Sequence, residues 1–213
     1  MPTTIRPACA DDADFIARTI LLAQRGPFPR GWLDIALDRP ESEVVDFIGR
    51  LATARAVSWW HVSKFLIAEV EGRPAAALCA LPAEGTGATA RAAIEEVATH
   101  SGLSTSELFA IFQRGAYTRA CWIQGGAGDW LIEHVAAQAA HRGRGLMQGL
   151  IAHALAAGRA AGFAQASITF VIGNDVAERC YARAGFRFAE EKRDTGFAAI
   201  TGSPGFRRFV RVI

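Results

Sequence analysis

The sequence predicts an α/β fold in which helices flank a mixed β-sheet. The 213 residues are 51% hydrophobic and 21% charged, which is typical of a globular protein with a core. Apolar residues of the C-terminal half follow first a strand period and then a helix period, in the order strand, turn, helix, strand, helix, strand, strand. A hairpin and amphipathic helices precede them. The length fits a single domain over residues 1–213 that carries a sizeable insertion.

The N-terminal elements follow from short apolar patterns. Residues 4–8 form a predicted strand. Asp11 and Asp12 can cap a following helix that has one apolar face, made by Phe15, Ile16, Ile20 and Leu21. A loop rich in glycine and proline follows at 26–31, and a second amphipathic helix is predicted over residues 41–53.

A β-hairpin and a helical insertion occupy the middle of the chain. Two strand-like runs, 65–70 and 74–81, flank the short polar turn Glu71-Gly72-Arg73. Residues 83–118 then predict one helix over 88–99 and another that begins at Ser104, where Ser104 and Glu107 have capping-box spacing. The apolar residues of this insertion indicate packing rather than a linker.

The C-terminal half supplies the rest of the sheet. A strand at 130–137 leads through a glycine turn into a helix over 146–161, and a strand at 165–172 follows. Gly173-Asn174-Asp175 starts a short helix that Gly185 can end. Two closing strands are predicted at 186–192 and 206–212.

The glycine turn His141-Arg142-Gly143-Arg144-Gly145-Leu146-Met147 predicts a phosphate site. It opens a helix, where several backbone N–H groups have no intrahelical acceptor and the helix dipole is positive. Arg142 and Arg144 add positive charge at the same place. We therefore expect a phosphorylated cofactor here.

Composition excludes several other classes of function. The formal net charge of +2 is too small to indicate nucleic acid, and the basic cluster Arg207, Arg208 and Arg211 reads as a solvated strand face or an anion contact. No apolar run is long enough for a membrane span, and residues 1–7 lack the layout of a signal peptide. The four cysteines are scattered without a CxxC pair, so we expect no metal site and a reducing, cytoplasmic location.

Three motifs resemble the GNAT superfamily of N-acetyltransferases. In that family a strand runs into an (Arg/Gln)-x-x-Gly-x-(Gly/Ala) turn that binds the pyrophosphate of coenzyme A; Gly143 and Gly145 match, whereas Ala140 departs from the first position. The segment from Asn174 to Phe186 is similar to the family's Asn-x-x-Ala-x-x-x-Tyr-x-x-x-Gly-Phe block. The opening Ile5-Arg6-Pro7-Ala8 is a third, weaker match. The resemblance covers residues 4–24, 64–82 and 128–213 and leaves 83–118 unmatched.

The resemblance implies a mostly antiparallel sheet, acetyl-CoA as the acyl donor and a primary amine as the acceptor. It assigns the pantetheine arm to the backbone of Val135 and Ala137, which can also polarise the thioester carbonyl. The pyrophosphate then binds the amides of Gly143, Arg144, Gly145, Leu146 and Met147, with Arg142 and Arg144 supplying charge. Asn174 is either a plain helix cap or a pantetheine contact.

Two side chains are candidates for proton transfer. Tyr181 either gives a proton to the departing thiolate or only packs its ring. Glu133 shares a strand face with Val135 by alternation, and burial in an apolar strand raises a carboxyl pKa toward that of a useful base; the alternative is a structural partner for an arginine. The same alternation places His134 on the opposite face as a core or surface residue.

Other expectations concern the acceptor side. We expect Trp59, Trp60 and Trp122 to pack in the core and Trp130 to line an acceptor pocket that the 83–118 helices cover. The acceptor is a small-molecule or peptide amine of unknown identity, and a homodimer is possible.

Two other functions were considered. A dinucleotide-binding fold requires the motif G-x-G-x-x-G. Counted from Gly143, the third glycine position is occupied by Gln148, and Gly149 follows one residue after it. A non-catalytic acyl-CoA-binding or regulatory protein on the same fold stays open.

Overall fold

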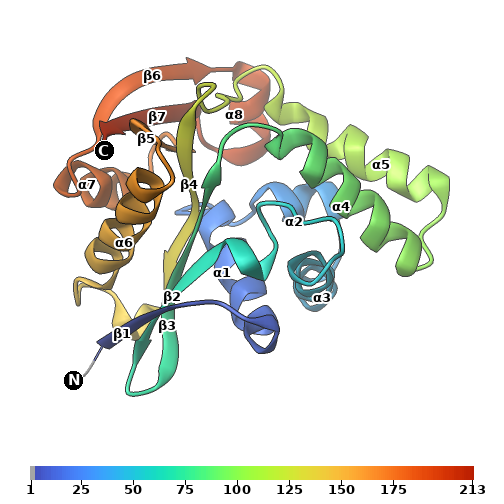
Figure 1. Ribbon diagram of the computed structural model, residues 1–213. Coiled ribbons are helices and arrows are strands. Elements are labelled where there is room, and N and C mark those ends of the chain that lie inside the picture. The colour runs from blue at the N-terminus through green and yellow to red at the C-terminus, as the bar shows by residue number, and fades with distance from the viewer. Residues whose placement is uncertain (1–2) are drawn as a thin grey trace.

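A seven-stranded sheet runs through the molecule, with helices on both faces (Figure 1). The computed structural model describes residues 3–213; Met1 and Pro2, part of the segment weighed as a signal peptide, lie outside the described residues. The strands are β1 (Thr3–Pro7), β2 (Phe65–Val70), β3 (Arg73–Pro82), β4 (Asp129–Ala137), β5 (Gln165–Val171), β6 (Arg187–Arg193) and β7 (Gly205–Val212).

The strand order confirms a mixed, mostly antiparallel sheet. The order is β1-β2-β3-β4-β5-β7-β6, and neighbouring strands are antiparallel except β4 and β5, which are parallel. The helices are α1 (Ala13–Arg25), α2 (Trp32–Leu37), α3 (Glu41–Ala52), α4 (Thr86–His100), α5 (Thr105–Gly115), α6 (Leu146–Ala160), α7 (Asp175–Arg183) and α8 (Thr195–Thr201).

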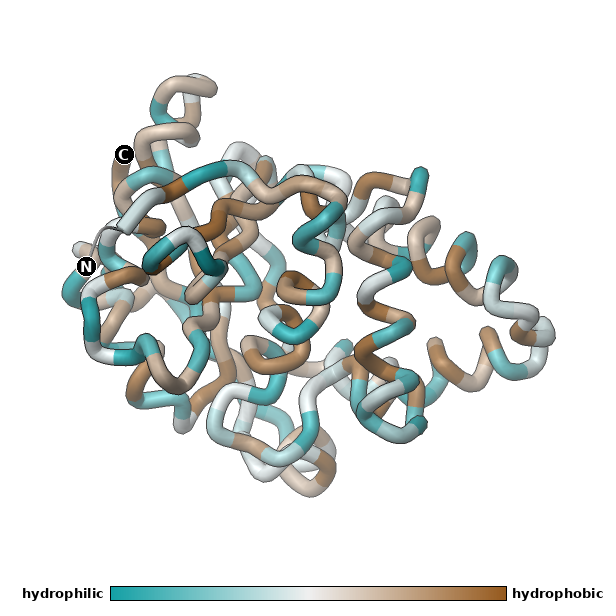
Figure 2. Tube along the Cα trace, turned by 90° about the horizontal axis from the view of Figure 1, so that it is seen from below, coloured by the Kyte–Doolittle hydropathy of each residue, from teal (hydrophilic) through white to brown (hydrophobic). Residues whose placement is uncertain are grey.

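The sheet separates two hydrophobic cores. One core packs α1 to α5 against side chains such as Ile67, Ala77 and Cys79. The other packs α6 and α7 against Ala68, Leu78 and their neighbours. Successive residues of β2 and β3 alternate between the two cores, which is the period of two expected for strands buried on both faces. Hydrophobic and hydrophilic segments alternate along the helices in Figure 2, as expected when one helix face is buried.

The insertion is an integral part of the fold. The capping box of α5 is confirmed, because the Glu107 amide donates to Ser104 Oγ over 3.3 Å and the Ser104 amide donates to the Glu107 carboxylate over 2.9 Å. Trp32 Nε1 of α2 donates to the carbonyl of Gly115 over 2.9 Å. The α4–α5 pair extends to one side of the sheet (Figure 1), and α5 is fastened to α2 at its end.

The predictions differ from the structure at three places. Asp12 does not cap α1; its carboxylate accepts two bonds from Arg6, of 2.7 and 2.8 Å, and one from the Cys9 amide. The short helices α2 and α8 were not predicted. Both span seven residues or fewer, which is too short for a helix period to be visible in the sequence.

In residues 3–213 no helix has the length and apolar character needed to cross a membrane. No group of three or more potential metal ligands occurs in the same residues.

Candidate functional site

The parallel strands β4 and β5 separate halfway along their length. They pair from Asp129 with Gln165 to Ile132 with Ile168, after which β4 stays paired with β3 and β5 with β7. Residues 133–137 therefore have one edge without a strand partner among residues 3–213. The Gln138 amide donates to Ala75 of β3 over 2.9 Å, so alternation along the strand directs the N–H groups of Ala137 and Val135 toward the open edge.

A β-bulge lies in this open part of β4. The pairing with β3 shifts between Ala77 and Cys79, so that two residues of β4 oppose the single residue Leu78. His134 occupies the bulge with a φ of 50°, a left-handed conformation that is uncommon outside glycine. The expectation that His134 faces away from Glu133 is therefore wrong, because the bulge interrupts the alternation and both side chains border the same cavity.

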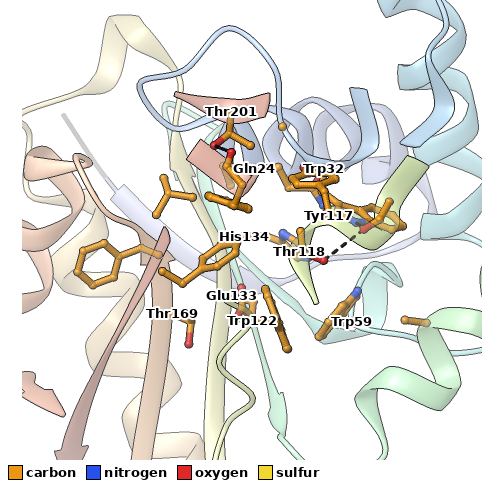
Figure 3. Close-up of a pocket in the computed structure, with 18 of the residues that line it drawn as sticks. Gln24, Trp32, Trp59, Tyr117, Thr118, Trp122, Glu133, His134, Thr169 and Thr201 are labelled. Atoms are coloured by element: carbon orange, nitrogen blue, oxygen red, sulfur yellow. Dashed lines mark hydrogen bonds between the residues drawn. The ribbon is translucent and has the colours of Figure 1, made fainter. Parts of the chain in front are cut away.

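The cavity at this point has a volume of about 690 Å³. Its floor comes from Glu133, His134 and Val135 of β4 together with residues 168–171 of β5. Helices α1, α2, α4, α5 and α8 supply the walls, so the 83–118 segment does border the pocket, as expected. Figure 3 shows Glu133 and His134 beside a space that Trp32, Trp59 and Trp122 surround.

Glu133 is the half-buried acid of the site. Within residues 3–213 its carboxylate has neither an ion pair nor a hydrogen bond, so the alternative role as an arginine's structural partner is not supported. Burial alone raises its pKa to about 8. A carboxyl group with this pKa is partly ionised near neutral pH and can take a proton from a bound ammonium.

His134 lies beside Glu133 as a neutral ring. Its imidazole stacks on Phe65 at a centroid distance of 6.1 Å and meets the edge of Trp59 at 6.3 Å. Burial lowers its pKa to about 3, so the ring carries no charge at neutral pH. Its Nε2 atom is buried and has no hydrogen-bond partner in the described part of the chain.

Tyr181 of α7 borders the same cavity. Its ring packs edge-on against Phe170 of β5 at 5.3 Å, and its side chain is buried. Burial raises the pKa of the phenol above its ordinary value, so the hydroxyl stays protonated across the working range of pH. The packing role and the proton-donor role are compatible with this position.

Asn174 caps α7 and also borders the cavity. Its side-chain oxygen accepts the Ala177 amide over 3.2 Å, so the cap is present, and the carboxamide lies near the far end of β5. The structure brings Glu133, Val135, Tyr181 and Asn174 to the border of one space. The expectation that Glu133 and Val135 share a strand face is wrong, because the bulge shifts the alternation: Glu133 pairs with Cys79 of one core, whereas Val135 packs against the other core.

The glycine turn lies apart from this cavity, just beyond the end of β4. Gly143 and Gly145 have φ values of 76° and 78°, a left-handed backbone conformation that would be strained in a residue with a side chain. Gly145 precedes α6, and no backbone hydrogen bond from the amides of Gly143 or Gly145 is found within residues 3–213. Arg142 Nε donates to the Ala137 carbonyl over 3.4 Å, which joins the turn to the end of the open strand.

The tryptophans meet expectation in part. Trp60 is buried in the core and Trp59 packs against it, as expected, and both border the cavity together with Trp122. Trp130 packs against Phe163 at 5.2 Å on the other side of the sheet. The expectation that Trp130 lines the acceptor pocket is therefore wrong. Adjacent tryptophans preceding a strand gave no signal of a cavity, because core aromatics have the same sequence pattern.

The C-terminal arginines are engaged in ion pairs and carbonyl contacts. Arg207 contacts Glu178 and Glu191, and Arg208 contacts Asp129 over 3.0 Å. Arg211 donates to the Ala184 carbonyl. This cluster closes the sheet around β7 rather than presenting a free anion site.

Comparison with known proteins agrees with this geometry. Residues 115–186 match the acetyltransferase (GNAT) family, which confirms the resemblance seen in the motifs. A solved acetyltransferase aligns with a TM-score of 0.71 and 18% identity over 99% of each chain. An N-acetyltransferase from Staphylococcus aureus Mu50 aligns with a TM-score of 0.67 and 18% identity over 98% of this chain and 100% of its own.

A third structure was solved with ligands bound. N-acetylglutamate synthase from Neisseria gonorrhoeae, complexed with coenzyme A and N-acetyl-glutamate, aligns with a TM-score of 0.51 and 14% identity over 100% of this chain and 35% of its own. At such identities these structures establish the fold. No curated protein matches the chain at a significant level.

Proposed function

From the GNAT family segment and the acetyltransferase fold, we propose that this protein transfers the acetyl group of acetyl-CoA to a primary amine. The donor would lie along the open edge of β4, with its pyrophosphate at the amides of residues 143–147 and its pantetheine arm at the backbone of Val135 and Ala137. Arg142 and Arg144 would add charge beside the pyrophosphate, and Asn174, besides capping α7, would contact the arm.

The observation that carries this proposal is the separation of β4 from β5. It leaves a strand edge whose N–H groups have no strand partner, with a phosphate-type turn at one end and an acid and a phenol at the other. An extended ligand can pair with such an edge as an additional strand. The glycine turn and the pair Glu133 and Tyr181 lie at opposite ends of this edge, so a long ligand could contact both.

The reaction needs few protein groups. The neutral amine attacks the thioester carbonyl, a C–N bond forms and the C–S bond breaks. Glu133 would accept the proton that the ammonium loses, directly or through water, and Tyr181 would donate a proton to the departing thiolate. A backbone N–H aimed at the carbonyl oxygen contributes about 2.7–4 kcal/mol to such a reaction.

Thiol release from acetyl-CoA tests the proposal. The purified protein is incubated with acetyl-CoA and a broad panel of primary amines, and free thiol is measured with a chromogenic disulfide. We expect release that depends on an amine and a product whose mass is that of the acetylated amine. Binding of CoA without acetylation of any amine would instead support the non-catalytic acyl-CoA-binding function.

A further inference from the structure

The rim and walls of the cavity carry an unusual distribution of charge. Among the residues that border it, Glu133 is the one carboxylate of the described chain, whereas the cations are Arg25, Arg30, Arg91, Arg119 and Lys192. Three of these cations are already neutralised by carboxylates that lie outside the cavity: Arg25 by Asp34 at 2.6 Å, Arg30 by Asp38 at 2.9 Å and Arg91 by Glu95 at 2.8 Å.

Arg119 and Lys192 have no carboxylate partner within residues 3–213. Both side chains are exposed, and both belong to the neighbourhood of Trp122: Lys192 Nζ donates to the Trp122 carbonyl over 3.3 Å, and Arg119 precedes Trp122 by three residues. The nearby carboxylate of Asp194 is committed to the amide of Phe197, which it caps over 2.7 Å. Two cations that no carboxylate contacts in residues 3–213 therefore stand at the solvent side of the cavity.

The wall between this cationic rim and Glu133 is aromatic. An unbroken series of ring contacts, with centroid distances from 4.9 to 6.3 Å, runs along it through Trp32, Trp60, Trp59, Trp122, Phe206, Phe197 and Tyr117. Four of the five tryptophans of the chain border the cavity. Faces and edges of this kind favour a flat, apolar ligand body.

Two indole N–H groups in this wall are buried and lack an acceptor in the described chain, those of Trp59 and Trp60. Neither nitrogen has accessible surface, so these N–H groups belong to the packed side of the wall and not to the space that a ligand fills. Within the cavity, the acceptor side thus offers aromatic rings and two exposed cations to a ligand but a single acid.

We propose, on the basis of the proposed acetyl transfer, that the acceptor is a primary amine with an aromatic body and an anionic group remote from the amine. Its amino group lies at Glu133 on the floor, its ring lies along the aromatic wall, and its anion lies at Arg119 and Lys192. The amine and the anion are at opposite ends because the one acid is half-buried on the floor and the two cations without a carboxylate contact in residues 3–213 are exposed. Polycationic amines are disfavoured by the same rim.

Three acceptors that differ only in charge test this inference: para-(aminomethyl)benzoate, its neutral carboxamide and its cationic amidine. We expect kcat/KM to fall in that order, with the benzoate favoured over the carboxamide by roughly two- to fivefold, the range for ion pairs between exposed groups. The preference should shrink as salt is raised. Aminohexanoate, which has the amine and the anion but no ring, should be a poorer acceptor than the benzoate.

Charge-removing variants identify the groups responsible. Arg119→Gln combined with Lys192→Gln should reduce the ratio of benzoate to carboxamide toward one, whereas Arg73→Gln, which removes an exposed charge at the distant β2–β3 hairpin, should leave that ratio as in the wild type. Equal kcat/KM for the three acceptors, or a preference for the amidine, would overturn the inference while leaving acetyl transfer intact.

The inference is also tested if no amine is acetylated. Calorimetric titration of the same three compounds into the CoA-saturated protein then reports their order of affinity. Tightest binding of the benzoate supports the assigned acceptor side, and the reverse order or equal affinities contradict it.

Discussion

A carboxyl group in apolar surroundings has a pKa set by desolvation, and Glu133 is such a group, half-buried and with no charged partner in residues 3–213. Its pKa of about 8 means that the fraction ionised rises through the neutral range. If Glu133 is the base, kcat/KM of the wild type rises with pH toward about 8, and Glu133→Gln lowers kcat/KM by roughly 10²–10⁴-fold and removes that dependence. A pH–rate profile for both proteins measures this. An unchanged profile in the variant would exclude the base role.

The same group makes stability depend on pH. Because the folded pKa lies above the ordinary value of 4.5, the stabilising neutral form is present in full at low pH, and its contribution is lost as pH rises to about 8. Glu133→Gln keeps a neutral side chain, so its free energy of unfolding relative to the wild type should increase as pH rises from about 4.5 to about 8 and stay constant above that. Glu84→Gln, at an exposed position outside the cavity, is the matched control and should show neither effect.

A substitution at Tyr181 can distinguish ring packing from proton donation, because only the proton donation needs the hydroxyl group. Tyr181→Phe keeps the ring contact with Phe170 and removes the proton. We expect kcat to fall by roughly 10²-fold or more while the melting temperature and the affinity for CoA stay near the wild-type values. Steady-state kinetics and calorimetry check this, and an unchanged kcat would leave Tyr181 with packing alone.

The pKa of a side chain can be predicted from the sequence where desolvation alone shifts it. The raised pKa of Glu133 follows from a carboxylate in an apolar strand, and the sequence shows that directly. The position of His134 does not, because a bulge depends on how β4 pairs with β3, and no local pattern records that pairing. The cations Arg119 and Lys192 were missed for a similar reason, since they are far apart in the sequence.

At the scale of elements, long periodic segments were predictable and short ones were not. Helices α3 to α6 and all seven strands lie close to their predicted ranges, since each has a repeated apolar period or a clear turn at its end. For α8, the signals at its ends, Asp194 as a cap and Gly202 with a φ of 83°, are present in the sequence. The helix between them has only seven residues and contains Gly196, so no apolar period supports the prediction of a helix there.

The turn before α6 provides an element-scale prediction. Gly145 has a φ of 78°, and a methyl group there would meet no other atom within 4 Å, so Gly145→Ala adds backbone strain without a clash. The left-handed conformation costs a residue with a side chain about 1–2 kcal/mol. We expect a folded protein with a lower melting temperature and weaker CoA binding, because the amides of the turn are displaced.

A control substitution at Gly49 distinguishes the effect of backbone strain at Gly145 from the general effect of replacing a glycine by alanine. Gly49→Ala, inside α3 and equally free of neighbours, should stabilise the protein by about 0.8–1 kcal/mol, the difference in helix propensity, and leave CoA affinity unchanged. Thermal unfolding and calorimetry on both variants make the comparison. Equal CoA affinity in Gly145→Ala and Gly49→Ala would argue against the turn as a phosphate site.

At the scale of the whole molecule, one sheet joins both halves of the chain. The N-terminal half of the chain supplies β1 to β3 and the C-terminal half supplies β4 to β7. Both hydrophobic cores include residues of β3 and of β4, where the two halves meet. This continuity supports our proposal of a single domain over residues 1–213. The open edge of β4 lies at the same junction, so a ligand that pairs there would contact both halves and stabilise the entire fold.

Calorimetric titration of acetyl-CoA into the wild type and Gly145→Ala tests the central claim most directly. A strand edge and a turn that together hold the donor predict one molecule bound per chain, an accompanying rise in melting temperature, and clearly weaker binding in the variant. Absence of heat at millimolar acetyl-CoA together with an unchanged melting temperature would contradict the account.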